Sequence, residues 1–191
     1  TIMLTAIKKL LGGGGGDSAK ADPVSSAAMR ELVTNLHYEI VPMKSIEPAI
    51  EALPPGAFVS VTCSPAKGIP ATLEYTERLL GLGHHPIPHF AARMVTGPDE
   101  TASLAAWLRD HGLDEVYVIA GDAPEPAGPY EGALPFIRDL IADRPGVRRI
   151  GIAGYPDGHA LIPPEVVKQQ LHAKQSVICD AGLEGWVSTQ M

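Results

Sequence analysis

The strongest constraint on the fold of this chain is a regular alternation of short apolar or β-branched runs with helical patterns. The run Glu115 to Ala120 has the composition of a buried strand. After a Gly-Asp-Ala-Pro turn, a helical pattern follows over Leu134 to Ala142. Strict alternation with short connections implies a parallel sheet. We therefore expect an α/β fold whose strands all end at one edge of the sheet.

Six strands are predicted, and a helix follows each of the first five. The strands are expected at 37–41, 58–63, 86–90, 115–120, 149–154 and 185–190. The helices after them are expected at 46–53, 70–82, 98–111, 134–142 and 164–174, with one more at 25–36 before the first strand. Two architectures fit this order: a doubly wound open sheet, or a (β/α)8 barrel of the TIM type. Both bind ligands where strands end and the following loops begin.

The first residues differ from the rest of the chain. Residues 1–24 include five consecutive glycines, Gly12 to Gly16, and read as a flexible tail. A phosphate-binding loop is not indicated, because no strand precedes the glycines and no Lys-Ser/Thr pair closes them. Residues 25–191 are expected to form one domain.

Composition excludes several classes of protein. Lys and Arg total 15 against 22 Asp and Glu, a net charge of −7, which argues against nucleic-acid binding and against an anionic membrane surface. The apolar runs are far shorter than the ~18 residues needed to cross a bilayer. Two cysteines, Cys63 and Cys179, cannot build a disulfide framework, and no secretion signal is convincing. We expect a cytoplasmic protein, with homo-oligomer formation left open.

Polar residues collect at the ends of the otherwise apolar strands. A barrel would bring these ends around one mouth, which makes their side chains the candidates for chemistry. They are Glu39, Thr62, His89, Asp122, Tyr155, His159 and Gln190.

Each candidate has two interpretations. Glu39, within a strand, is either a carboxylic acid inside a barrel, with a raised pKa and a role as general acid, or an exposed residue on an edge strand. Asp122 is either a ligand contact, brought close by Gly121, or an Asx turn before Pro124. Tyr155 to His159 is either a turn that contacts a planar or phosphate-bearing ligand, or a plain loop.

No metal site is expected. His85 and His89 have the i, i+4 spacing that would bind a metal on a helix, but Pro86 and Pro88 forbid a helix there. The chain also has no G-x-S-x-G and no CxxC motif, so hydrolase and zinc chemistry are not indicated.

Six short motifs, taken in order, resemble the methylenetetrahydrofolate reductase family, in particular a divergent bacterial branch. The resemblance runs from about His37 to Met191, and its most telling parts are the Gly-Asp pair and the Gly-Tyr-Pro-Asp-Gly-His run. The motifs are Tyr38-Glu39-Ile40-Val41-Pro42, Phe58-Val59-Ser60-Val61-Thr62, Pro88-His89-Phe90, Ala120-Gly121-Asp122-Ala123-Pro124, Gly151 to His159, and Ser188-Thr189-Gln190.

The resemblance implies a (β/α)8 barrel that holds FAD. A hydride would pass from NADH or NADPH through FAD to 5,10-methylenetetrahydrofolate, giving 5-methyltetrahydrofolate. By this resemblance Glu39 is the acid that opens the one-carbon bridge, Asp122 lies near the pterin and the flavin, and Gln190 contacts the folate. The positions implied to line the dinucleotide site are Thr62, His89, Gly121, Asp122, Tyr130, Tyr155 and His159.

The chain departs from the family pattern at several site positions and in its length. Ala120 stands where the family usually has an Arg, and Lys168, His172 and Lys174 match its diphosphate-binding residues only loosely. Two alternatives therefore stay open: a flavin-independent reductase that takes its hydride directly from NADH, and a non-catalytic folate-binding barrel or partner subunit.

The length of the chain is a further departure from the family pattern. Six βα units fall short of the ~250 residues of a full barrel, so we expect that the chain is a fragment or that something else closes the barrel.

Overall fold

The computed structural model describes residues 36–189, apart from residues 44 and 161. The chain divides into two units, Thr1–Leu36 and His37–Met191, and the description below concerns the second. The predicted tail 1–24, nearly all of the predicted helix 25–36, and Gln190 lie outside the described residues.

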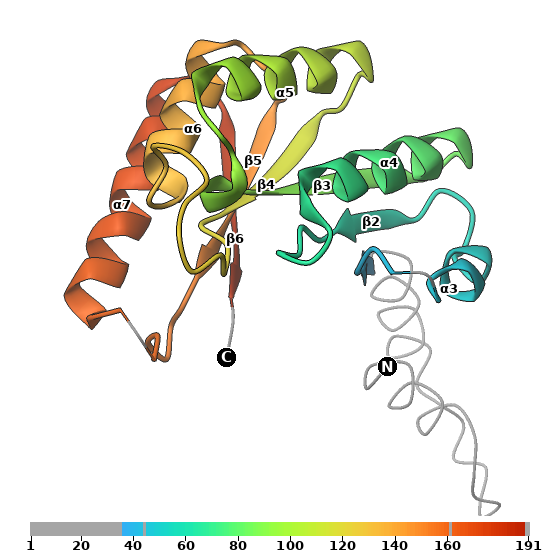
Figure 1. Cartoon of the computed structure of the whole chain (residues 1–191), viewed down its shortest axis with the longest axis horizontal. Helices are drawn as coiled ribbons and strands as arrows, with labels where there is room; N and C mark the ends of the chain where they lie inside the picture. The colour runs from blue at the N-terminus through green and yellow to red at the C-terminus, as the bar shows by residue number, and fades with distance from the viewer. Residues whose placement is uncertain (1–35, 44, 161, 190–191) are drawn as a thin grey trace, which may run out of the picture. The chain divides into compact units, whose positions relative to one another are not determined.

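Strands and helices alternate along the described chain (Figure 1). The strands are β1 (His37–Ile40), β2 (Phe58–Val61), β3 (His85–Ala91), β4 (Glu115–Ile119), β5 (Arg149–Gly154) and β6 (Glu184–Thr189). The helices are α3 (Glu47–Glu51), α4 (Gly68–Gly81), α5 (Pro98–Asp110), α6 (Ala133–Ala142) and α7 (Pro164–Asp180), with a short 3-10 turn η1 (Ala92–Met94) after β3.

These elements confirm the predicted alternation, and the two largest differences from the prediction lie at the end of α7 and directly after β3. Helix α7 continues to Asp180, past the predicted end at Lys174, because Ile178 in its last turn is fully buried against the sheet. The turn η1 was not predicted, since Ala92–Met94 carries no turn residue of the usual kind.

The six strands form one parallel sheet in the order of the sequence, β1 to β6. A doubly wound sheet reverses its strand order at one point, so this order rules that alternative out. The sheet is curled into a half-barrel (Figure 1). This α/β arrangement is compatible with part of a TIM-type barrel, of which the described residues supply six strands.

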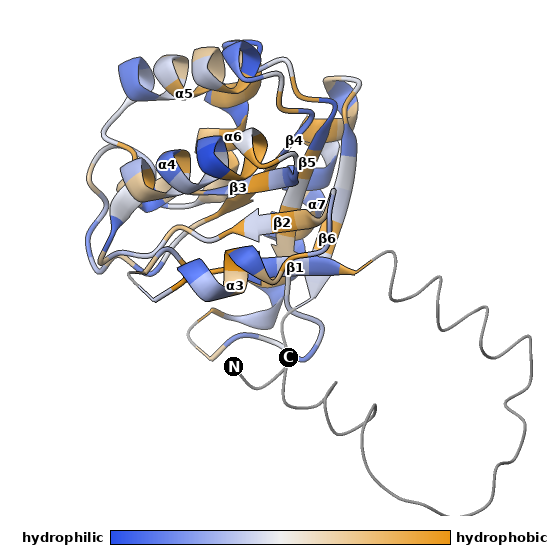
Figure 2. Cartoon of the chain, turned by 90° about the vertical axis from the view of Figure 1, so that its right-hand side faces the viewer, coloured by the Kyte–Doolittle hydropathy of each residue, from blue (hydrophilic) through white to orange (hydrophobic). Residues whose placement is uncertain are grey.

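The apolar core lies between the sheet and the helices. Alternate residues of β3, β4 and β5 pack against α5, α6 and α7, as Phe90, Val118 and Ile152 do against Phe136 and Leu140. A smaller cluster packs β1 and β2 against α3 and α4. Figure 2 shows that α4 and α5 alternate between hydrophilic and hydrophobic stretches. Successive side chains of a strand point to opposite faces, so the remaining alternate residues of these strands point to the concave face of the sheet.

The register of the strands sets which residues lie side by side on this concave face. His89, Tyr117, Gly151 and Trp186 are consecutive partners across β3 to β6. Ile87, Tyr117 and Ala153 form a small buried cluster, and Tyr155 and Trp186 pack against it. The concave face thus carries both aromatic and polar side chains, whereas the buried strand residues on the helix-facing side, such as Phe90, Val118 and Ile152, are apolar.

The two cysteines lie in different surroundings. Cys63 is buried and Cys179 is exposed, and both are free thiols. Within residues 36–189, no helix has the length and apolar character that crossing a membrane requires.

Candidate ligand site at the carboxyl ends of the strands

A cavity of about 360 Å³ lies where β4 and β5 end. It is bounded by these strand ends, by the start of α6 and by one side of α7, and most of its lining is apolar. Its charged residues, as far as the structure describes them, are Lys174 and Glu131. The cavity therefore offers an apolar surface with a cation at one wall.

A second cavity of about 320 Å³ adjoins the first. Both are lined by Gly154, Tyr155, Val167 and Leu171, and the second also reaches Lys168 and Thr189 of β6. Tyr155, the residue directly after β5, thus lies at the junction of two cavities. Their position matches the strand-end location that the sequence predicts.

Lys174 and the start of α6 supply positive charge to the first cavity. The Lys174 Nζ lies 3.5 Å from the carbonyl oxygen of Ala153, to which it donates, and burial lowers the pKa of this amine. Gly132, the N-cap residue of α6, and Ala133 line the cavity, and no side chain caps the helix. Free N–H groups at a helix N-terminus favour anions. This wall of the cavity suits a phosphate or carboxylate group.

Tyr155, at the junction of the cavities, is contacted by His159 and lies within the electrostatic influence of Asp122. The rings of Tyr155 and His159 meet edge to face, with centroids 4.8 Å apart. Burial raises the pKa of the half-buried Tyr155, and the charge of Asp122 raises it further. Asp122 itself is exposed on the loop between β4 and α6. Two of the predicted site residues, Tyr155 and His159, are therefore in ring contact, and Asp122 is near enough for its charge to act on Tyr155.

A glycine is required at position 121 because the chain after β4 passes very close to the end of β3. Its φ is +88°, and a Cβ there would lie 2.8 Å from the Cβ of Ala91. The sequence suggested that this glycine lets the chain approach a ligand. In the structure the close approach is to β3, which fixes the direction in which the Asp122 loop leaves β4.

Thr62 and His89 lie nearer the interior of the concave face. His89 is 7% exposed, its ring lies 4.5 Å from that of Tyr117, and burial lowers its pKa to about 4. Six buried side-chain atoms in the described residues have no hydrogen-bond partner; four belong to residues of the concave face, and those of Glu115 and Arg149 lie at the amino ends of β4 and β5. They are Thr62 Oγ1, His89 Nε2, Glu115 Oε1, Tyr117 Oη, Arg149 Nε and Trp186 Nε1. Unpaired buried polar atoms are rare in folded proteins, and a catalytic role, a bound water or an ion can account for them.

Glu39 is exposed on β1, which pairs with β2 alone among the described strands. This exposed position is the one that the edge-strand interpretation predicts, and the role of Glu39 as general acid stays a prediction. Glu39 shares the concave side with Tyr117: burial raises the pKa of Tyr117 to about 12, and the charge of Glu39 is among the smaller causes.

Tyr130 lies in the core between α5 and α6. Of the residues implied to line the dinucleotide site, Tyr155 lines the two cavities, whereas Thr62, His89, Gly121, Asp122, Tyr130 and His159 do not. Tyr130 is 2% exposed, and its hydroxyl donates to Asp139 Oδ2 at 2.7 Å and lies 2.9 Å from Thr101 Oγ1. Its ring packs edge to face on Phe136. The preceding residues are polar or small, but the phenol reaches back into the core between α5 and α6, which no local sequence signal indicates.

His85 and His89 lie on strand β3, as the two prolines predict, and not on a helix. Within residues 36–189, no group of three or more His, Cys, Asp or Glu residues is placed to hold a metal ion. Gln190, the predicted folate contact, lies outside the described residues.

The comparison with protein families adds no assignment. No family model matches this chain. The likeness to methylenetetrahydrofolate reductases stays a prediction from the motifs.

Sequence reasoning missed two kinds of residue here. Tyr117 and Trp186 are ordinary strand aromatics in the sequence, and only the register brings them together on the concave face. Arg93 follows a strand and resembles any surface cation, yet it contacts the Asp122 loop thirty residues along the chain. Neither carries a motif that could have marked it.

Proposed function

We propose that this chain is a methylenetetrahydrofolate reductase-like oxidoreductase, or the catalytic part of one. It would reduce 5,10-methylenetetrahydrofolate to 5-methyltetrahydrofolate with NADH or NADPH, through FAD. The observation that carries the proposal is the pair of adjoining cavities that meet at Tyr155, with His159 in ring contact with it and Asp122 near enough for its charge to act on it.

The residues present fit a dinucleotide. The cavities measure about 360 and 320 Å³, within the range of ligand sites. Apolar walls suit an aromatic ring, and Lys174, Lys168 and the start of α6 suit phosphate groups. FAD bound here would supply the hydride carrier between the nicotinamide and the folate.

The carboxylates supply the acid and the charge that folate reduction needs. Glu39 would donate a proton to N10 of the folate, which opens the one-carbon bridge and leaves a cationic iminium at N5. The Asp122 carboxylate would stabilise that cation. Hydride addition to the iminium carbon then gives the methyl group. Gln190 would contribute a contact to the folate.

A flavin-independent reductase is the second candidate, and Ala120 favours it. This residue lines the first cavity at the end of β4 and brings no cation there. In this case the nicotinamide would pass its hydride directly to the folate iminium, and Glu39 and Asp122 would keep the same roles.

The absorption spectrum and turnover of the purified protein test both candidates. A flavoprotein is yellow, releases its flavin on denaturation, and oxidises NADH when methylenetetrahydrofolate is present. Turnover by a colourless protein would favour the flavin-independent route. If tetrahydrofolate binds without any NADH oxidation, the non-catalytic folate-binding alternative replaces the proposal.

A further inference from the structure

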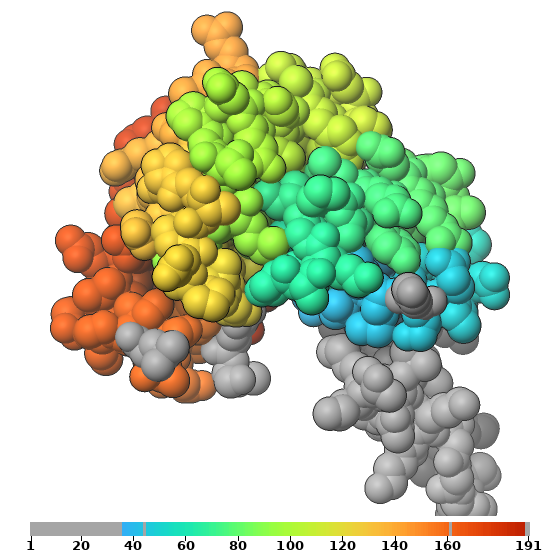
Figure 3. All heavy atoms as spheres, in the orientation of Figure 1, coloured from blue at the N-terminus to red at the C-terminus, as the bar shows by residue number. Residues whose placement is uncertain are grey.

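The loop that carries Asp122 has no regular structure of its own. It spans residues 120–132, between the end of β4 and the start of α6. Loops of this length without secondary structure are usually functional or poorly ordered. Figure 3 shows it, in yellow to gold, on the surface beside the green segment that follows β3. That segment contains Arg93.

The guanidinium of Arg93 binds this loop through four oxygens. Its Nε donates to the carbonyl of Ala123 at 2.8 Å, and one terminal nitrogen donates to the carbonyl of Pro124 at 2.8 Å. The other terminal nitrogen donates to Glu131, to its carbonyl at 3.2 Å and to its carboxylate at 3.1 Å. One side chain thus holds the loop near both of its ends.

The backbone of Arg93 adds two more contacts. Its N–H donates to the carbonyl of Ala120 at 2.9 Å, and its carbonyl accepts from the N–H of Ala127 at 2.8 Å. Gly128 presses so closely on the same segment that a Cβ there would lie 2.4 Å from the carbonyl oxygen of Thr96. The start, middle and end of the loop therefore all contact the segment that follows β3.

The hydrogen bonds from Arg93 to backbone carbonyls contribute more to holding the loop than its ion pair with Glu131 does. The Glu131 side chain is 80% exposed, and exposed ion pairs contribute little. The Arg93 side chain is 18% exposed, and its planar fork matches several acceptors at once, which a lysine ammonium cannot do. Asp122 lies between two of the anchored residues, Ala120 and Ala123.

We propose that Arg93 is the positioning residue for Asp122: it fixes the backbone on both sides of this carboxylate and thereby sets where the carboxylate meets the folate. The chemical consequence rests on the proposed function, whereas the clamp itself does not. A small displacement of a charge from its reacting partner reduces its stabilising effect sharply.

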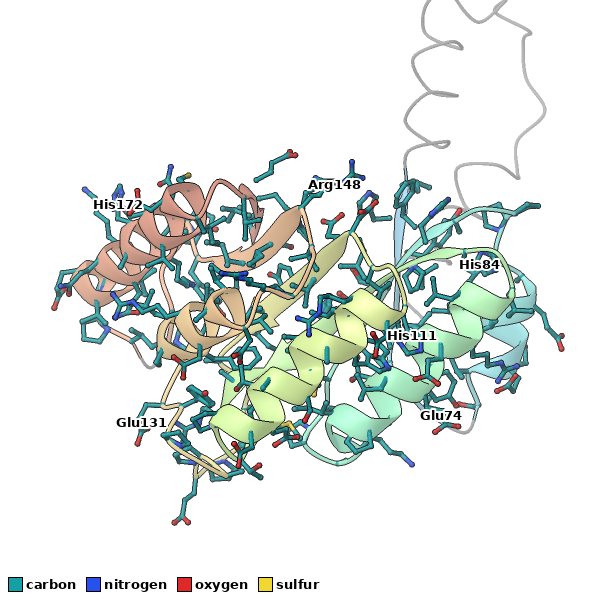
Figure 4. The ribbon with its side chains drawn as sticks, turned by 90° about the horizontal axis from the view of Figure 1, so that it is seen from above. Glu74, His84, His111, Glu131, Arg148 and His172 are labelled. Atoms are coloured by element: carbon teal, nitrogen blue, oxygen red, sulfur yellow. The ribbon has the colours of Figure 1, made fainter. Side chains whose placement is uncertain are left out.

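Hydrogen exchange of the full chain tests the clamp in Arg93→Lys and Arg93→Met. Amides of residues 121–131 should exchange about tenfold faster or more in both variants, while β5 exchanges as in the wild type. Glu131→Gln should change little, since it leaves the carbonyl contacts intact. Arg148→Lys is the matched control, because Arg148 pairs with exposed Asp114 and lies far from Glu131 (Figure 4). Unchanged exchange in the loop, or faster exchange spread over the whole domain, would overturn the proposal.

A double-mutant cycle tests whether Arg93 acts through Asp122. Arg93→Lys should lower kcat/KM for the folate about tenfold or more, and the same change on an Asp122→Asn background should lower it far less. Additive losses would overturn the positioning role even if the loop exchanges faster. A wild type with no folate turnover would refute the proposed function, and the exchange experiment would still decide the clamp.

Discussion

Tyr117 of β4 and Trp186 of β6 are in ring contact, with centroids 5.1 Å apart, although strand β5 lies between their own strands. The contact exists because the residue of β5 between them is Gly151, which is the register partner of both. A Cβ at Gly151 would lie 2.4 Å from atoms of each ring. Because Gly151 has no side chain, the rings of Tyr117 and Trp186 can contact each other across β5 on the concave face.

Gly151→Ala should destabilise the domain. The added methyl has to displace two large rings in a packed layer, and overpacking of this kind costs roughly 1–3 kcal/mol. Urea unfolding followed by Trp fluorescence measures the change, and Trp186 itself reports on its surroundings.

Gly185→Ala is the matched control for that experiment. Gly185 lies on β6 next to Trp186, and a Cβ there would meet only Ile178, at an ordinary 3.5 Å. Its free energy of unfolding should stay close to that of the wild type. Equal losses from the two alanines would mean that the close packing at Gly151 does not decide stability.

His89→Phe should remove part of the dependence of stability on pH. In the folded chain burial lowers the pKa of His89 from the ordinary 6.5 to about 4. Between these values the unfolded chain binds more protons, so the free energy of unfolding falls as the pH falls from 6.5 towards 4. The loss amounts to a few kcal/mol, on the order of the pKa shift. The stabilising contribution of the neutral ring is complete above pH 6.5.

Urea unfolding of the wild type and of His89→Phe at pH 7 and at pH 5 measures this effect. The variant should lose less stability between the two pH values. His85→Gln serves as the comparison, because His85 is exposed at the start of the same strand. A pH dependence that is identical in wild type and His89→Phe would contradict the predicted burial of a neutral imidazole.

Glu39→Gln should lower the rate of folate reduction by about 10²–10⁴-fold, the usual contribution of a general acid. Oxidation of NADH by an artificial acceptor should survive, since that half-reaction needs no proton donated to folate. Steady-state assays of both half-reactions check this, with Glu51→Gln as an exposed control. An equal fall in both would make Glu39 a structural residue.

Asp122→Asn should affect two separate measurements. Loss of the carboxylate should slow transfer to folate and, if flavin is bound, make the flavin easier to reduce, because a nearby negative charge disfavours the anionic reduced form. Potentiometry and rapid-mixing kinetics follow the two effects, which point in opposite directions.

The same variant should lower the pKa of Tyr155, because the charge of Asp122 is one cause of its elevation. Ultraviolet difference titration against a Tyr155→Phe background isolates this phenol. Glu125→Gln, an exposed change in the same loop, should leave it unaltered. An unchanged Tyr155 together with unchanged folate reduction would reduce Asp122 to a turn residue.

Lys174→Gln should weaken the binding of phosphate-bearing nucleotides by about tenfold, the loss of one charge-assisted contact. The amine is partly buried at the wall of the first cavity, and among the described residues that line this cavity Lys174 is the one cation. Equilibrium dialysis with FAD and with NADH measures the affinities separately. Exposed Lys67 gives the control Lys67→Gln, and equal affinities in all three proteins would place the nucleotide elsewhere.

The sequence by itself determined the order and type of the elements. β-branched runs such as Phe58-Val59-Ser60-Val61 bury one face of a strand, and Pro and Gly mark the ends of helices such as α5, so local patterns suffice. Local patterns also located Asp122, Tyr155 and His159 at strand ends. These features depend on residues that are close together along the chain.

Only the tertiary structure decided which residues meet across strands and loops. The choice of a sequential, curled sheet over a doubly wound one depends on strand order, which periodicity does not encode. The burial of Tyr130, the exposure of Glu39 and the hold of Arg93 on the Asp122 loop depend on partners elsewhere in the chain or on a strand's place in the sheet. Such contacts form when the sheet curls and the loops pack, so their physical cause lies in the three-dimensional arrangement and not in any local pattern.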